Sequence, residues 1–382
     1  MRFLNEFATD LRLSRAPATA FAIVGIYWGS FAGLVPDLKA AIGASDGVFG
    51  IAMLVSSIGA VAAMWLAPRV DARLGARAMQ GCALFLALAF LLPGLASGAV
   101  FFSLAMLLAA SGSGSIDVII NTRVSGIEAA NKRSLMNLNH ALFSFAYAGA
   151  AVCAGLFREA GFSPAFVFAV ACAITLVLLP FMHHQPAREE DSTVVDGKTA
   201  KRALVLLGGA IILIAFLAEQ ATEAWSALHL ERGLGASAAQ GALGPAILGL
   251  TMGIGRLSGQ FISAHVRETR VLQGAALIAA TGIAIAGAAN SLSVGYAGFT
   301  IFGLGVSVLA PMAYSAVGKR TSSQTRAVAI TRISVIGYLG FFVGPPMMGL
   351  ISESFGLKAS FFAVAALLLV ISAVLAPLMR KQ

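Results

Sequence analysis

Seven ionisable side chains lie inside the long apolar runs of this 382-residue chain: Asp37, Asp117, His140, Glu219, Glu223, Arg256 and Arg332. An ionisable residue at the centre of a membrane-spanning helix costs roughly 2.5–3.5 kcal/mol on insertion scales, so such residues normally face a cavity or a partner. The sequence contains no Ser-His-Asp nucleophile motif, no phosphate-binding Gly-Lys-Ser/Thr loop and no CxxC or HExxH spacing. We therefore expect binding and proton exchange, with no enzyme activity, no cofactor and no metal site.

Two polar groups predict a proton-exchanging pair. Asp117 and Asn121 are four residues apart, so they share one helix face, and Asn137 and His140 share a face of the next apolar run. At a rise of about 1.5 Å per residue, both groups lie in the cytoplasmic third of the bilayer. A carboxylate and an imidazole at one depth could exchange protons, since His titrates near neutrality. The alternative is that Asp117 only neutralises a basic residue at a helix end, such as Arg123 or Arg133.

Glu219 and Glu223 are also four residues apart, on one face of a later apolar run. Two like charges in a poorly hydrated place cannot both ionise at low cost, so one of the two is expected to hold a proton near neutral pH. The spacing therefore predicts proton coupling at this pair. The alternative for Glu223 is an interfacial residue in water.

Arg256, Arg332 and Trp28 could contact a solute. A guanidinium binds anionic or hydroxyl-rich groups, but it can also pair with a carboxylate to close the inner side, or extend to the membrane surface. Trp28 could stack on a sugar ring, although packing is the commoner fate of such an aromatic residue.

The elements that position these residues follow from the composition. The chain is 58% hydrophobic and only 11% charged, against roughly 45–50% apolar and about 25% charged residues in soluble domains. A helix needs ~20 mostly apolar residues to span a bilayer, and the sequence holds twelve such runs. We place the spans at Ala16–Leu38, Val48–Ala67, Ala78–Ala96, Ala99–Asn121, Leu135–Phe157, Pro164–Met182, Ala203–Ser226, Gly241–Ile262, Leu272–Ala289, Val294–Val317, Val328–Ile351 and Ala359–Leu378.

The basic residues give the orientation. Twenty of the 26 Lys and Arg residues fall in segments on the side of the two termini, four fall on the opposite side, and two lie within spans. Because basic residues accumulate in cytoplasmic segments, this bias predicts that both termini are cytoplasmic. The formal net charge of +9 therefore reflects membrane topology, and we expect a lipid bilayer and no nucleic acid as partner.

The two halves of the chain repeat each other. RAMQGCALFLA from Arg77 matches RVLQGAALIAA from Arg270, and GLFREAGFSPAFVFAVA from Gly155 matches GLISESFGLKASFFAVA from Gly349. The offset is close to half the chain in both pairs. The polar residues 183–202 between the halves are expected to form a flexible cytoplasmic linker. The sequence thus predicts an all-α membrane protein with twelve transmembrane helices in two pseudo-symmetric six-helix bundles, residues 1–182 and 203–382.

In span count, linker and repeat, the whole chain resembles the major facilitator superfamily of transporters. In that family, a Gly, an Asp followed directly by Arg, and a second Gly usually follow the second span. The stretch APRVDARLGAR from Ala67 is similar, although Ala72 separates Asp71 from Arg73. The resemblance implies gating roles for Asp71, Arg73 and Arg77. GRLSGQF from Gly255 is similar to the counterpart run in the second half, which implies a gating role for Arg256.

Two further segments, GSIDVIINTRVSGIE and EQATEAWSALHLERGLGAS, look like a little-characterised bacterial branch of this family related to the sugar-proton symporters. The resemblance implies a multi-pass protein of the bacterial inner (plasma) membrane. We expect a monomer that carries a small polar solute, either sugar-like or an organic acid, by alternating access coupled to protons. The predicted proton-coupling residues are Glu219, Asp117, Glu223 and His140, and the predicted solute-binding residues are Trp28, Asn121, Asn137 and Arg332.

Two alternatives stay open. A multidrug or metabolite exporter of the same fold would have an aromatic-rich, weakly charged cavity. A non-transporting membrane sensor would carry an added cytoplasmic domain or a long tail, whereas only Lys381 and Gln382 follow Arg380.

Overall fold

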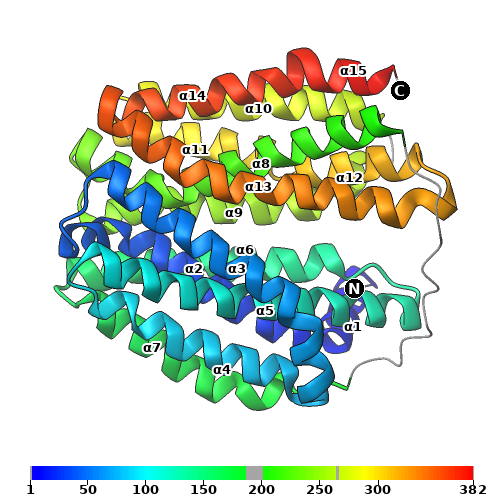
Figure 1. Ribbon diagram of the computed structural model, residues 1–382, viewed down its shortest axis with the longest axis horizontal. Helices are drawn as coiled ribbons and strands as arrows, with labels where there is room; N and C mark the ends of the chain where they lie inside the picture. Colours follow the sequence, from blue (N-terminus) through cyan, green and yellow to red (C-terminus); the bar gives the residue numbers. More distant parts are fainter. Residues whose placement is uncertain (1, 186–200, 264–265, 382) are drawn as a thin grey trace.

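The computed structural model describes residues 2–185, 201–263 and 266–381, and every regular element in these residues is helical (Figure 1). Most of the expected linker, residues 186–200, lies outside the described residues. The first half contains α1 (Arg2–Leu13), α2 (Arg15–Ala41), α3 (Asp46–Leu74), α4 (Ala78–Leu91), α5 (Ala99–Asn131), α6 (Met136–Glu159) and α7 (Pro164–Leu178). The second half contains α8 (Arg202–Leu228), α9 (Ala238–Ser263), α10 (Glu268–Ala288), α11 (Leu292–Val306), α12 (Leu309–Lys319), α13 (Ser323–Phe355), α14 (Leu357–Val370) and α15 (Ala376–Arg380).

The number of spans agrees with the sequence prediction. Within the described residues, eleven helical stretches are long and apolar enough to cross a membrane. One of them, Asp46–Leu95, turns at Gly75 into α3 and α4. The φ of 53° and ψ of −120° at Gly75 are together readily adopted only by glycine. This stretch therefore supplies two spans, and the total is twelve. The last two spans of the second half are made by α13 and by α14 with α15.

The helices form two groups, with α2 to α7 in one and α8 to α15 in the other (Figure 1). Both chain termini lie toward the same end of the bundle, on the right of Figure 1. We call this end the terminal face and the opposite end the distal face. The groups meet where α6 packs on α9 and where α3 packs on α13.

Glycine allows close contact between helices within each group. A Cβ atom on Gly29 of α2 would lie 2.1 Å from the carbonyl oxygen of Tyr147 on α6. In the second half, a Cβ atom on Gly340 of α13 would lie 2.4 Å from the carbonyl oxygen of Leu213 on α8. Both helix pairs therefore approach backbone to backbone, as small residues permit in membrane helices.

The internal repeat has a structural counterpart. Gln80 of α4 donates from Nε2 to the carbonyl oxygen of Leu179 at 2.9 Å, and Gln273 of α10 donates to that of Ser372 at 3.3 Å. The two acceptors are separated along the chain by the same interval as the two donors. The repeated glutamine thus ties the third span of each half to the end of the sixth.

Candidate functional site

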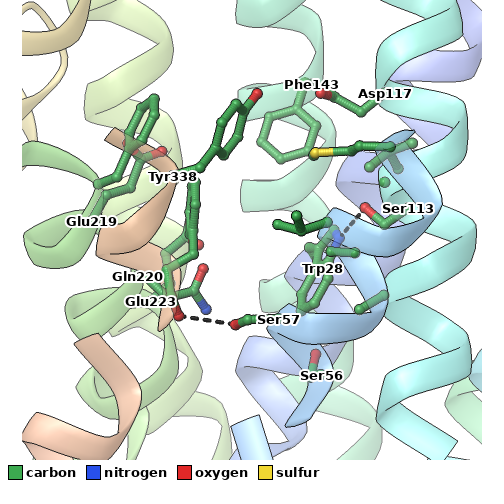
Figure 2. A pocket seen from close by; sticks show the side chains of 18 of the residues that line it. Trp28, Ser56, Ser57, Ser113, Asp117, Phe143, Glu219, Gln220, Glu223 and Tyr338 are labelled. Atoms are coloured by element: carbon green, nitrogen blue, oxygen red, sulfur yellow. Dashed lines mark hydrogen bonds between the residues drawn. The ribbon is translucent and has the colours of Figure 1, made fainter. Parts of the chain in front are cut away.

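A cavity of about 270 Å³ lies between the two groups of helices (Figure 2). Helices α2, α3, α5 and α6 line it from the first half, and α8, α9 and α13 line it from the second. In Figure 2, Glu219 and Tyr338 face Trp28 and Ser113 across the open space. Because both halves supply its walls, any movement of one half against the other changes the shape of the cavity.

On the first-half side, three residues that the sequence placed on shared helix faces form a hydrogen-bonded row. Asn121 donates from Nδ2 to Asp117 Oδ1 at 3.1 Å, and Asn121 Oδ1 lies 3.2 Å from His140 Nε2. The spacing of four residues stacks Asp117 and Asn121 on consecutive turns of α5, next to His140 on α6. The carboxylate and the imidazole are therefore bridged by an amide.

The alternative partners of Asp117 are engaged elsewhere. Arg123 donates to Asp71 Oδ2 at 3.0 Å, and Arg133 Nε lies 2.5 Å from Asp10 Oδ1. Within the described residues Asp117 forms no ion pair, although it lines the cavity. The structure therefore does not support the reading of Asp117 as the counter-ion of a helix-end arginine.

On the second-half side, Arg256 joins the two halves through polar contacts. It donates from Nη2 to Glu219 Oε1 at 3.0 Å and from Nη1 to Ser144 Oγ on α6 at 2.7 Å. Ser144 in turn donates to the carbonyl oxygen of His140 at 3.0 Å. A polar row thus runs from Asp117 to Glu219 through both halves, and His140 contributes both its ring and its backbone carbonyl to it. Arg256, expected at a gate, lies inside the cavity.

Glu223 lies one turn beyond Glu219 on α8, and both side chains line the cavity together with Gln220 (Figure 2). This position does not fit the alternative of an interfacial Glu223 in bulk water. The cavity therefore holds three carboxylates, those of Asp117, Glu219 and Glu223, against one guanidinium.

Trp28 also lines the cavity, and its Nε1 donates to Ser113 Oγ at 2.8 Å (Figure 2). Its neighbour Tyr27 points into the first half, where its hydroxyl lies 3.0 Å from that of Thr175. Trp28 is one of six aromatic residues in the cavity wall, with Phe21, Phe143, Phe216, Tyr338 and Phe341.

The remaining predicted residues lie outside the cavity wall. Asn137 is half-buried at the start of α6. Arg332 is exposed on α13, nine residues and therefore half a helical rotation from the cavity residue Phe341. Arg73 and Arg77 are exposed beside the turn at Gly75. Asp71 joins α3 to α5 through its pair with Arg123, so this ion pair lies within one half.

Sequence reasoning missed a second polar group, which joins the halves near the distal face. Arg158 of α6, whose side chain is only 3% exposed, donates to Glu231 Oε1 at 2.7 Å and to Glu231 Oε2 at 3.0 Å. It also donates to Asp37 Oδ1 of its own half at 2.6 Å. Glu231 follows α8 in a π-helical turn, His229–Gly233. We call this group, together with Lys39, Asp46, Glu159, Arg232, Ser352 and Glu353, the distal network.

Asp46, at the start of α3, makes the second connection of the distal network. Arg232 of the other half donates to Asp46 Oδ1 at 2.6 Å, and Ser352 of α13 donates to Asp46 Oδ2. Lys39 of the same half lies 3.0 Å from Asp46 Oδ1. Asp46 is therefore surrounded by donors from both halves.

Two acids complete the distal network by reciprocal capping. Glu159 accepts a hydrogen bond from the backbone N–H of Ala239 at 2.9 Å, and Glu353 accepts one from the N–H of Gly47 at 2.6 Å. Each carboxylate thus binds the first turn of a helix in the opposite half, where it complements the helix dipole. The sequence signal for this group is that Glu159 and Glu353 occupy the same position in the repeated segments that begin at Gly155 and Gly349.

The whole chain is similar to known transporters. The family model described as Major Facilitator Superfamily matches residues 18–307 and, in a second alignment, residues 210–382. The chain is 31% identical over 377 residues to an uncharacterized MFS-type transporter of Yersinia pestis, with 97% of each chain covered.

Two solved structures share the fold. A bacterial homolog of the human lysosomal transporter Spinster, in an inward-facing and unoccupied conformation, superposes with a TM-score of 0.76 at 17% identity, with 97% of each chain covered. A D-xylose-proton symporter superposes with a TM-score of 0.74 at 15% identity, again with 97% of each chain covered.

Proposed function

This chain belongs to the major facilitator superfamily of membrane transporters, and we propose that it moves a small polar solute together with protons by alternating access. The observation that carries this proposal is the polar row from Asp117 to Glu219, which runs through both halves around one cavity. The row crosses between the halves at the hydrogen bond from Arg256 to Ser144, so groups that could take up a proton lie on both sides of that contact.

Glu219 and Arg256 are the proposed coupling pair. Their side chains are 17% and 16% exposed, so their attraction is only partly screened by water. Protonation of Glu219 removes the charge that holds Arg256, while Ser144 still holds the guanidinium from the other half. The proton load of Glu219 therefore decides whether Arg256 is held from both sides or by Ser144 of the first half alone. Asp117, Glu223 and His140 supply further proton-accepting groups in the same wall.

The cavity chemistry favours a hydroxyl-rich solute without a net negative charge. Ser56, Ser57, Ser113, Gln220 and the indole of Trp28 offer donors and acceptors in its wall. An organic acid would add a negative charge beside three carboxyl groups, which one guanidinium does not fully balance even when one of Glu219 and Glu223 is protonated. A D-xylose-proton symporter has the same fold, so a sugar-like solute is compatible with this architecture.

The distal network is the proposed gate on one side of the cavity. It joins the two halves at the distal face, whereas the ion pairs at the terminal face in the described residues, such as Asp71–Arg123 and Lys319–Glu268, lie within one half. The state described here is then closed at the distal face. With the termini in the cytoplasm of a bacterial cell, as the basic residues predict, the closed side is the outer side of the inner membrane.

A second candidate, export of an amphipathic compound, is favoured by the six aromatic residues in the cavity wall. The three carboxylates argue against the weakly charged cavity expected of such an exporter. The direction of proton movement separates the two candidates. A solute that enters proteoliposomes with protons makes the medium alkaline, whereas solute entry in exchange for protons makes the medium acidic.

The test begins with a thermal-shift screen of the purified protein against sugars, polyols, organic acids and amino acids at acidic and neutral pH. A bound solute stabilises the folded protein by about 2.7 kcal/mol at a hundred times its Kd. The best solute is then applied to proteoliposomes that contain a pH-sensitive dye.

Glu219→Gln should abolish solute-driven proton movement and keep solute counterflow, which needs no net proton transfer. The matched control is Glu128→Gln, because Glu128 lies outside the cavity wall and accepts from the backbone N–H of Leu135. Unchanged proton movement in Glu219→Gln would remove this residue from the mechanism.

A further inference from the structure

A second hollow lies at the terminal face, away from the central cavity. It is a groove of about 640 Å³ between the first turns of α8 and the early turns of α13. Three of its eight lining residues are basic, four are apolar and one is a threonine, and we call it the basic groove: Lys201, Arg202, Arg332, Val205, Leu206, Val335, Ile336 and Thr331. Arg332 thus lines the basic groove and not the cavity wall, so the proposed transport cycle assigns it no role.

The two kinds of lining residue are separated along the helix axes. Lys201 and Arg202 stand at the start of α8, and Leu206 follows one turn deeper. On α13, Arg332 is likewise followed one turn deeper by Val335. Leu206 is 52% exposed and Val335 is 62% exposed, which is the usual condition of membrane-helix residues that face acyl chains.

We propose that the basic groove binds one anionic phospholipid of the adjoining leaflet. Arginine donates to phosphate oxygens in a planar fork, and Lys201 adds a third positive charge. No acidic residue lines the groove among the described residues, so an anionic headgroup meets no repulsion there. The exposed side chains of Leu206 and Val335 then lie beside the acyl chains.

Occupancy of the groove links the lipid to the two helices that shape the cavity. Glu219 and Tyr338, which line the cavity, lie further along α8 and α13. A lipid that bridges Arg202 and Arg332 therefore ties the two helices together at the terminal face.

The experiment measures lipid binding to the purified, delipidated full-length chain by native mass spectrometry. Phosphatidylglycerol and phosphatidylcholine of the same acyl composition are compared in the wild type and in the triple variant Lys201→Gln, Arg202→Gln and Arg332→Gln. The control variant, Arg267→Gln, Arg270→Gln and Arg380→Gln, removes the same charge from exposed residues elsewhere at the terminal face.

The wild type should bind phosphatidylglycerol more tightly than phosphatidylcholine by on the order of ten- to a hundred-fold, the scale expected from three basic residues near a membrane surface. The triple variant should lose this preference to within about two-fold, and the control variant should keep it. An equal loss in both variants, or a wild type without preference, would overturn the proposal. Equally tight binding of soluble glycerol phosphate would also overturn it, because the apolar side chains would then play no part.

Discussion

The substitution Glu231→Gln should weaken the distal network and so destabilise the state that is closed at the distal face. In the wild type, both carboxylate oxygens of Glu231 accept from Arg158, at 2.7 and 3.0 Å. A glutamine keeps one oxygen as a neutral acceptor, and its amide nitrogen cannot accept from a guanidinium. The contact is made across the two halves, so only the state that is closed at the distal face loses it.

The magnitude follows from the kinds of hydrogen bond involved. Hydrogen bonds to charged groups contribute about 1.5–3 kcal/mol each, and neutral ones about 0.5–1.5 kcal/mol. Asp37 of the same half still neutralises part of the Arg158 charge in both states. We therefore expect the closed state to lose about 2 kcal/mol, which raises the ratio of distal-open to distal-closed molecules about 30-fold.

The assay is a distance measurement between two spin labels at the distal face. Ser97, between α4 and α5, and Asn290, between α10 and α11, are exposed loop residues in different halves, so cysteines there report the separation of the halves. Cys153 is the exposed native cysteine and is replaced by serine, while Cys82 and Cys172 are buried. If about one wild-type molecule in a hundred is open at the distal face, a 30-fold change in the ratio makes roughly one in four Glu231→Gln molecules open there.

The control is Asp37→Asn, which removes a partner of Arg158 without breaking a contact between halves. It should leave the ratio within about two-fold. An unchanged distance distribution in Glu231→Gln would show that the Arg158–Glu231 contact does not stabilise the closed state. An equal widening in Asp37→Asn would show the same.

Three other substitutions test the cavity and the packing. Arg256→Lys keeps the positive charge but loses the planar guanidinium that donates to Glu219 and Ser144 at the same time. Solute-driven proton movement in proteoliposomes should therefore fall about ten-fold, and full activity would show that the charge alone suffices. Asp117→Asn removes a titrating group, so the difference between solute-induced thermal shifts at acidic and neutral pH should shrink, whereas a difference equal to that of the wild type would exclude Asp117 from proton linkage. Gly29→Ala places a Cβ 2.1 Å from a backbone oxygen and should destabilise the fold by about 1–3 kcal/mol, seen as a lower melting temperature. Its control, Gly149→Ala, has no atom within 4 Å of the new Cβ, and an equal loss there would contradict the packing argument.

The sequence predicted the spans well because hydropathy and helix length are local properties. Helix ends were less predictable: α5 continues to Asn131, ten residues beyond the expected end of the span, since a helix can extend past the bilayer into polar surroundings. The shared face of Asp117 and Asn121 followed from spacing, because residues four apart lie on one side of a helix. For His140 the sequence predicted only a similar depth on the next span, and the contact of its ring with Asn121 joins two helices, α5 and α6.

Other parts of the site depend on the distance between remote segments, which spacing does not give. Arg158 looked like an ordinary basic residue at a helix end, yet its partner Glu231 lies in the other half. The position of Arg332 within its apolar run predicted its depth in the membrane, but not that its side chain lies on the side of α13 that faces the basic groove.

The reciprocal caps of Glu159 and Glu353 have a consequence for symmetry. Each acid holds the first turn of a helix in the opposite half, so the same contact occurs twice around the axis that relates the halves. That is the pattern of an isologous interface, in which residue i meets residue j and j meets i. Two identical six-helix units with a twofold axis along the membrane normal would form both contacts from a single acid. The distal closure thus retains the geometry of a homodimer within one chain.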